Sequence, residues 1–148
     1  TNDLCKAFRY VLTLEPTEIT ILGASGGRED HTLGNISHLI DFTAQAPCPV
    51  RIVTDTGRFE AAHESATFHC QEGTQISIFA FDPGLKIKSA GLKYPTDSVV
   101  FDALWKATLN EASSSTVTLT FNHPSGVLVF FADDLKHIID HSVQVPFR

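Results

Sequence analysis

The hydrophobic positions in the first third of the chain change their spacing twice. Apolar residues recur with helical spacing over residues 4–12, form a short continuous run over 18–22, and return to helical spacing from 33 to about 42. The run suits a buried parallel strand. Helix, strand, glycine-rich turn and helix in this order are typical of the end of a doubly wound α/β sheet.

The pattern changes after residue 46. Short apolar segments with β-type spacing alternate with turn residues, which predicts strands over 50–54, 67–70, 75–81, 85–89, 115–121 and 127–131. Residues 101–110 fit either a helical turn or a strand, and 137–148 either a closing strand or a tail. We therefore expect an α/β plus all-β protein. Residues 1–46 would end an α/β nucleotide-binding domain, and 47–148 would form a β-sandwich of jelly-roll type.

Composition and charge limit the partners and the location that can be expected. The chain of 148 residues has a net charge of −6 and a pI near 5.5, which disfavours binding to a phosphate backbone and therefore to nucleic acid. Cys5, Cys48 and Cys70 lack paired spacing and suggest reduced thiols rather than a disulfide frame. No apolar run approaches the roughly 20 residues that span a bilayer, so no membrane partner is expected. These features predict a cytoplasmic location.

The run GASGGREDHTLGN at residues 23–35 follows the first strand and precedes the second helix. In α/β sheets, ligands bind beyond the carboxyl ends of the strands, where this run must lie. Glycines there let backbone N–H groups approach an anion, Arg28 offers a planar fork of donors to phosphate, and Asp30 could bind a metal or a substrate cation. The alternative is a surface turn with solvated charges. The run fits neither a Walker loop nor GxGxxG.

For the other candidates, the residues alone favour a structural explanation. Asp3 can be a favourable charge at the N-terminal end of a helix dipole. The loop GLKYP at 91–95 sets an aromatic beside a cation but can be an ordinary strand end, and TLNE at 108–111 can be a turn. The histidines show no HxH or HExxH spacing, which disfavours a zinc site.

Taken in order, the segments TNDLCKAF, ILGASGGREDHTLGNISHLIDF, ISIFAFDP, SAGLKYP and TLNE resemble thiamin pyrophosphokinase over nearly the whole chain. The chain departs from that family at Leu109, where Ser more often precedes Asn, and at Thr96, where an apolar residue usually follows Tyr-Pro. The family's acidic motifs DGG and GDxDS are absent. Because the sequence also starts at Thr1 and contains no Met, we expect that it begins inside a larger gene product, and that activity requires the preceding part.

The resemblance implies a homodimeric enzyme that transfers the pyrophosphoryl group of ATP to the hydroxyl of thiamin, giving thiamin diphosphate and AMP, with Mg²⁺ as cofactor. An α/β domain would bind ATP, and a β-sandwich domain would help to bind thiamin. By the same resemblance Asp3, Arg28 and Asp30 would be catalytic, with Asp3 as a magnesium ligand.

The resemblance also assigns binding residues. The nucleotide would meet Gly26, Gly27, Arg28 and His31, and thiamin would meet Asp30, Ser89, Tyr94 and Asn110. Tyr94 would face the thiamin rings, because an aromatic ring is a suitable surface for a cationic thiazolium. The alternatives are a kinase of a different heteroaromatic alcohol and a non-catalytic small-molecule-binding β-sandwich module with a vestigial α/β segment.

Overall fold

The computed structural model describes residues 2–132 and the backbone of 144–145. The chain divides into two compact units, one formed by residues 1–61 with 133–148 and the other by 62–132. The expected domain boundary lay at residues 46 and 47. Both units contain β-sheets, and helices are few. Within the described ranges, no helix is long and apolar enough to cross a membrane.

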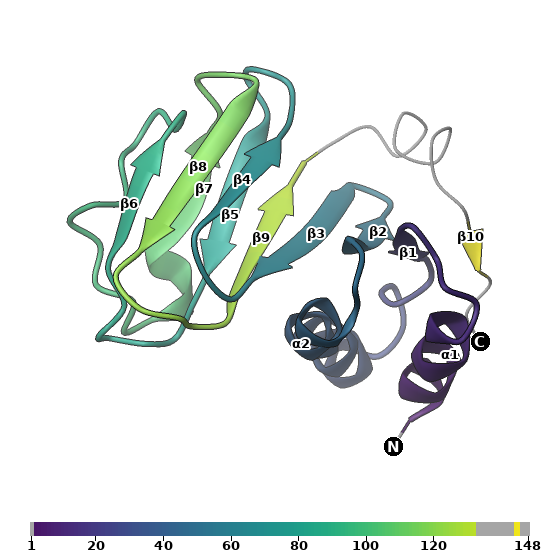
Figure 1. Cartoon of the computed structure of the whole chain (residues 1–148). Coiled ribbons are helices and arrows are strands. Elements are labelled where there is room, and N and C mark those ends of the chain that lie inside the picture. The colour runs from purple at the N-terminus through teal and green to yellow at the C-terminus, as the bar shows by residue number, and fades with distance from the viewer. Residues whose placement is uncertain (1, 133–143, 146–148) are drawn as a thin grey trace. The chain divides into compact units, whose positions relative to one another are not determined.

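The first unit is a mixed sheet with two helices (Figure 1). The strand order is β10-β1-β2-β3, in which β1 pairs in parallel with β10 and β2, and β3 runs antiparallel to β2. The elements are α1 (Asp3–Leu12), β1 (Ile19–Ile21), α2 (Glu29–Gln45), β2 (Val50–Thr54), β3 (Gly57–Ala62) and β10 (Gln144–Val145). The antiparallel β3 was not predicted from the sequence. Residues 137–148, expected as either a closing strand or a tail, lie mostly outside the described residues.

The two helices form where the hydrophobic spacing predicts them. The side chain of Asn2 caps α1 by accepting a hydrogen bond from the Cys5 amide at 2.9 Å. The apolar face of α1 packs on α2, where the rings of Phe8 and Phe42 stack with centroids 4.0 Å apart. Helix α2 begins at Glu29, four residues before the first periodic apolar position, so the end of the glycine run belongs to the helix.

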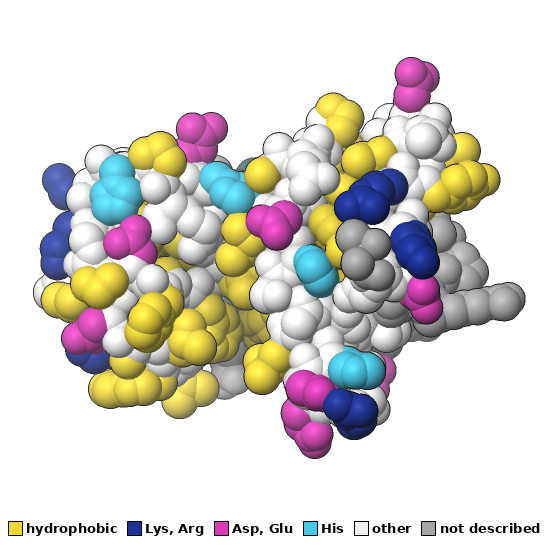
Figure 2. Space-filling model, turned by 90° about the horizontal axis from the view of Figure 1, so that it is seen from below, with side chains coloured by type: hydrophobic (Ala, Val, Ile, Leu, Met, Phe, Trp, Pro, Cys, Tyr) yellow, Lys and Arg dark blue, Asp and Glu magenta, His cyan; other side chains and the backbone are white. Residues whose placement is uncertain are grey.

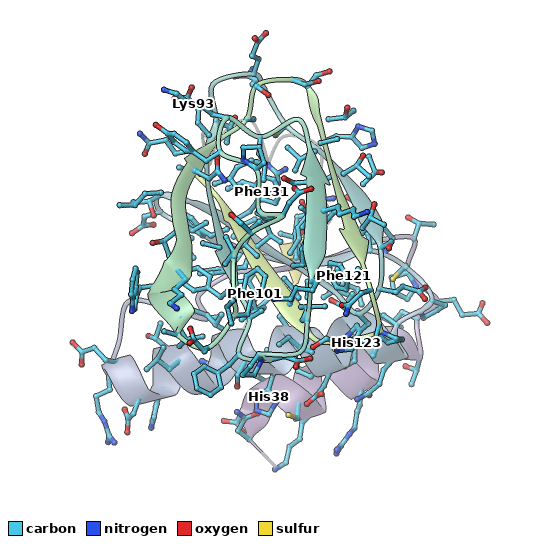
Figure 3. The ribbon with its side chains drawn as sticks, turned by 90° about the vertical axis from the view of Figure 1, so that its left-hand side faces the viewer. His38, Lys93, Phe101, Phe121, His123 and Phe131 are labelled. Carbon is cyan, nitrogen blue, oxygen red and sulfur yellow. The ribbon has the colours of Figure 1, made fainter. Side chains whose placement is uncertain are left out.

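The second unit consists of two antiparallel sheets of order β9-β5-β7 and β4-β8-β6. Its hydrophobic core includes fully buried Phe101 and Phe131 (Figure 3). The elements are β4 (Ala66–His69), β5 (Gln75–Phe79), β6 (Ile87–Ala90), the 3₁₀ turn η1 (Leu104–Lys106), β7 (Ala107–Glu111), β8 (Thr116–Phe121) and β9 (Val127–Phe131). The ambiguous residues 101–110 thus contain both a helical turn and most of a strand.

Several large hydrophobic side chains of the second unit remain exposed, and Figure 2 shows hydrophobic side chains gathered on the face of this unit that it draws. The exposed residues are Phe81, Tyr94, Val100, Leu104, Trp105 and Leu109. Leu109 is the most unusual of them, because its backbone φ is +61°, a left-handed conformation that branched and bulky residues seldom adopt.

Candidate functional site

A cavity of about 510 Å³ lies in the first unit, between the N-terminal ends of α1 and α2 and the loop after β1. Asp3 reaches it from the first turn of α1. Gly27, Arg28, Asp30 and His31 reach it from the loop and the first turn of α2. The structure therefore brings five of the predicted site residues together. The carboxyl end of β1 leads into this loop, as expected for ligand sites of α/β sheets.

Glycine is required in this loop for its backbone conformation. Gly23 and Gly26 have φ of +74° and +91°, which residues with a Cβ adopt only with strain. A Cβ at Gly26 would meet nothing within 4 Å, so its conformation rather than crowding calls for glycine. Gly26 shapes the turn without lining the cavity, whereas Gly27 lines it. Asn35 of α2 braces the loop, because its Nδ2 donates to the Ala24 carbonyl at 3.2 Å.

Arg28 and Asp30 form a bidentate ion pair at the cavity. Arg28 Nε lies 3.1 Å from Asp30 Oδ1, and Arg28 Nη2 lies 2.6 Å from Asp30 Oδ2. The two side chains are 72% and 61% exposed, so water screens the pair and its net contribution to stability is small. A phosphate oxygen can therefore compete for the same guanidinium donors with little loss.

Asp30 is held as a carboxylate. Its pKa lies below the ordinary value of 3.8, first because of the hydrogen bond from Arg28 and further because of the bond from the His31 amide to Oδ1 at 2.9 Å. Asp3 lines the same cavity, which therefore contains two acidic residues and one arginine. Among the described residues, no group of three or more His, Cys, Asp or Glu side chains is arranged to hold a metal ion.

A second cavity of about 300 Å³ lies in the second unit, lined by Gln75, Lys93, Tyr94, Leu109, Asn110 and Glu111. Tyr94 is 57% exposed, and Lys93 Nζ lies 5.5 Å from the centroid of its ring. In Figure 3, Lys93 and His123 lie toward opposite ends of the second unit. An exposed aromatic ring with a neighbouring acid, Glu111, is a suitable surface for a flat cation.

Two of the three thiamin residues predicted in this unit line the second cavity. Tyr94 and Asn110 belong to it, but Ser89 does not. Ser89 Oγ instead accepts a hydrogen bond from the Thr96 amide at 2.9 Å, which ties β6 to the loop that follows Tyr94. The side chain of Asn110 also bonds to backbone, since its Oδ1 accepts from the Tyr94 amide at 3.1 Å.

Sequence reasoning missed several residues of these cavities. Asn35 ends the quoted run, but its hydrogen bond back to Ala24 is visible only from the way α2 approaches the loop. Gln75 and Leu109 line the second cavity because β5 and β7 are neighbours in the sheet. The adjacent cation and aromatic in LKYP did point to Lys93, whereas Glu111 was not singled out.

Comparison with protein families assigns both units. Residues 1–58 match the catalytic domain of thiamin pyrophosphokinase, and residues 57–130 match its substrate-binding domain. The chain belongs to the thiamin pyrophosphokinase family. Because a catalytic-domain match accompanies the substrate-binding one, a non-catalytic β-sandwich module is not favoured. No protein of curated function matches the chain.

Solved structures of thiamin pyrophosphokinases share the fold. The Bacillus subtilis protein is 24% identical, with a TM-score of 0.75, and the match covers 91% of this chain and 64% of that one. The Enterococcus faecalis family protein is 20% identical, with a TM-score of 0.75 and coverage of 90% and 64%. The Candida albicans protein is 17% identical, with a TM-score of 0.64 and coverage of 78% and 44%. The chain thus spans less than two thirds of each of these relatives.

Proposed function

We propose that the protein is a thiamin pyrophosphokinase, which transfers the pyrophosphoryl group of ATP to the hydroxyl of thiamin and releases AMP. The observation that carries this proposal is the first cavity. It joins a glycine-shaped turn, the Arg28 guanidinium and the carboxylates of Asp3 and Asp30 within the stretch that matches the family's catalytic domain.

The residue types suit transfer between phosphates. Such transfer depends mainly on positioning and on neutralising charge, because the protein itself forms few covalent bonds. Arg28 would bind phosphate oxygens of ATP, with Gly26, Gly27 and His31 at the same turn. Because Asp30 now occupies the Arg28 donors, a bound phosphate would release the Asp30 carboxylate toward thiamin or the metal.

The first cavity also fits Mg²⁺. This ion keeps several waters and usually takes one or two protein carboxylates together with substrate phosphates, so two acidic residues that line one cavity are a suitable donor set. Asp3 would hold the ion. When bound, Mg²⁺ supplies positive charge that offsets the charge of the polyphosphate.

In the second unit, Tyr94 would stack on the thiamin rings, and Asn110 and Ser89 would support that pocket. The finer descriptions of the fold, a doubly wound nucleotide-binding domain followed by a jelly-roll sandwich, stay predictions, as do the homodimer and the cytoplasmic location. The two fold descriptions are consistent with a mixed sheet in the first unit and two antiparallel sheets in the second.

Product analysis of the intact gene product tests the proposal. Incubation with thiamin, ATP and Mg²⁺ should form thiamin diphosphate and AMP in equal amounts. Formation of thiamin monophosphate and ADP would overturn transfer of a pyrophosphoryl group. Turnover of another heteroaromatic alcohol but not of thiamin would instead favour the alternative kinase.

Two substitutions separate the bidentate geometry of the Arg28 guanidinium from its charge. Arg28→Ala should lower kcat/KM by about 100-fold or more, in line with the loss of a donor to transition-state charge. Arg28→Lys should keep only part of the wild-type kcat/KM, because the Lys ammonium cannot make two parallel hydrogen bonds to a phosphate. Arg9→Ala is the matched control, since Arg9 is an exposed base of the same unit outside the cavity. An Arg28→Ala protein as active as Arg9→Ala would refute the clamp.

A further inference from the structure

Asn110 is the most completely bonded side chain at the second cavity. It is 7% exposed, and its Oδ1 accepts hydrogen bonds from the Tyr94 amide at 3.1 Å and the Glu111 amide at 2.8 Å. Its Nδ2 donates to the Tyr94 carbonyl at 2.7 Å. Both backbone groups of Tyr94 are therefore bound to one amide, which imitates the paired bonds of a strand neighbour.

This amide completes a short ladder. Backbone bonds join Ser113 to Gly91 and Lys93 to Glu111, each at 2.8 Å, so the segment before Tyr94 is held to the end of β7. Pro95 follows and has no amide to donate. At Tyr94, the side chain of Asn110 therefore replaces the backbone of the neighbouring strand as the hydrogen-bond partner of this segment.

A bulge in β7 turns Asn110 inward. Ile76 pairs with Asn110 and Ile78 with Ala107, so two residues of β7, Thr108 and Leu109, lie opposite the single Ser77. Ser77 Oγ accepts from the Leu109 amide at 3.2 Å, and Leu109 takes φ of +61°. The extra residue leaves Leu109 83% exposed while Ala107 and Asn110 are both buried.

We propose that Asn110 is a positioning residue: it fixes the Tyr94 backbone so that the exposed ring keeps one place at the cavity, and it acts on the thiamin rings through Tyr94 rather than by contacting them. The proposal rests on the proposed function and changes the role expected of Asn110. Its Oδ1 lone pairs are used by two amides, so that atom has no free acceptor site for a ligand.

Amide hydrogen exchange tests the tie without any ligand. Asn110→Ala should speed exchange at the Tyr94 amide by about fivefold or more relative to wild type, because its acceptor is removed. Exchange at Ile78, in the middle of the core, reports global unfolding and should change less. Asn110→Asp keeps an acceptor for the Tyr94 amide and loses only the Nδ2 donor, so exchange there should stay closer to the wild-type rate than in Asn110→Ala. Where Asn110→Ala fails to fold, Asn110→Leu, which has a similar volume and no acceptor, is measured in its place. Gln75→Ala, which removes an amide side chain from the same cavity, should leave Tyr94 unchanged.

A double-mutant cycle with Tyr94→Ala then separates positioning from direct contact. In the wild-type background, Asn110→Ala should weaken thiamin binding by about tenfold, but in the Tyr94→Ala background by less than about twofold, because the two residues act as one unit. Equal losses in both backgrounds would overturn the proposal. Unchanged exchange at the Tyr94 amide would overturn it too, whatever the protein binds. If wild-type protein bound no thiamin while Asn110→Ala still showed faster exchange at the Tyr94 amide, the proposed function and the link to thiamin would be refuted. The hydrogen bonds from Asn110 to the Tyr94 backbone would then stand on their own.

Discussion

Gly91→Ala is expected to destabilise the protein by two additive effects that a matched variant can separate. Gly91 has φ of +86°, and a Cβ built on it would lie 2.1 Å from the Thr116 carbonyl oxygen, 3.2 Å from the Thr116 carbonyl carbon and 3.3 Å from Val117 Cα. All three atoms are backbone of β8, the middle strand of its sheet, and cannot rotate away as a flexible side chain could.

The first effect is conformational and the second steric. A left-handed φ costs an alanine about 1–2 kcal/mol. Gly73→Ala isolates this effect, because Gly73 has φ of +90° and a Cβ there would meet nothing within 4 Å. The clash at Gly91 forces a shift of backbone in a packed sheet, which adds about 1–3 kcal/mol. We therefore expect losses of about 1–2 kcal/mol for Gly73→Ala and about 2–5 kcal/mol for Gly91→Ala.

Urea unfolding of both variants at one pH measures the two losses. Similar m-values would show that the free energies of unfolding of the two variants can be compared directly. If Gly91→Ala and Gly73→Ala agreed within about 0.5 kcal/mol, the contact between Gly91 and β8 would not exist as described. Because Gly91 opens the segment that carries Tyr94, folded Gly91→Ala protein should also bind thiamin more weakly than Gly73→Ala.

Three further predictions concern stability. The pKa of Asp82 lies below its ordinary value of 3.8, chiefly because of the hydrogen bond with His123. The stabilisation by Asp82 is therefore present above pH 3.8 and is lost as the pH falls through the lowered pKa. Asp82→Asn should flatten the acid side of a curve of unfolding free energy against pH, and an unchanged acid side would contradict this. Leu109→Asn should raise the free energy of unfolding by about 1 kcal/mol in thermal or urea denaturation, because Asn tolerates a left-handed φ; a loss would show that Leu109 makes contacts that outweigh its strain. Asn2→Ala should cost about 1 kcal/mol by circular dichroism melting, since the cap on Cys5 is lost, and an unaltered melt would refute the cap.

The sequence by itself determined the elements whose hydrogen bonds are local. The helical spacing of α1 and α2 and the strand β1 could be predicted, because helix contacts join residues three or four apart and a short apolar run suits a buried strand. The same locality let the glycine run predict a turn between β1 and α2, and a site beside it that contains Arg28 and Asp30.

Only the tertiary structure decided what depends on strand register and on the approach of distant segments. Ser89 and Asn110 were both predicted as thiamin ligands from their motifs, yet the register of β6 and β7 puts backbone partners beside them, at Thr96 and Tyr94. A single extra residue in β7 reverses which side chains face inward, and no local preference of TLNE specifies it, because leucine avoids the conformation that Leu109 adopts.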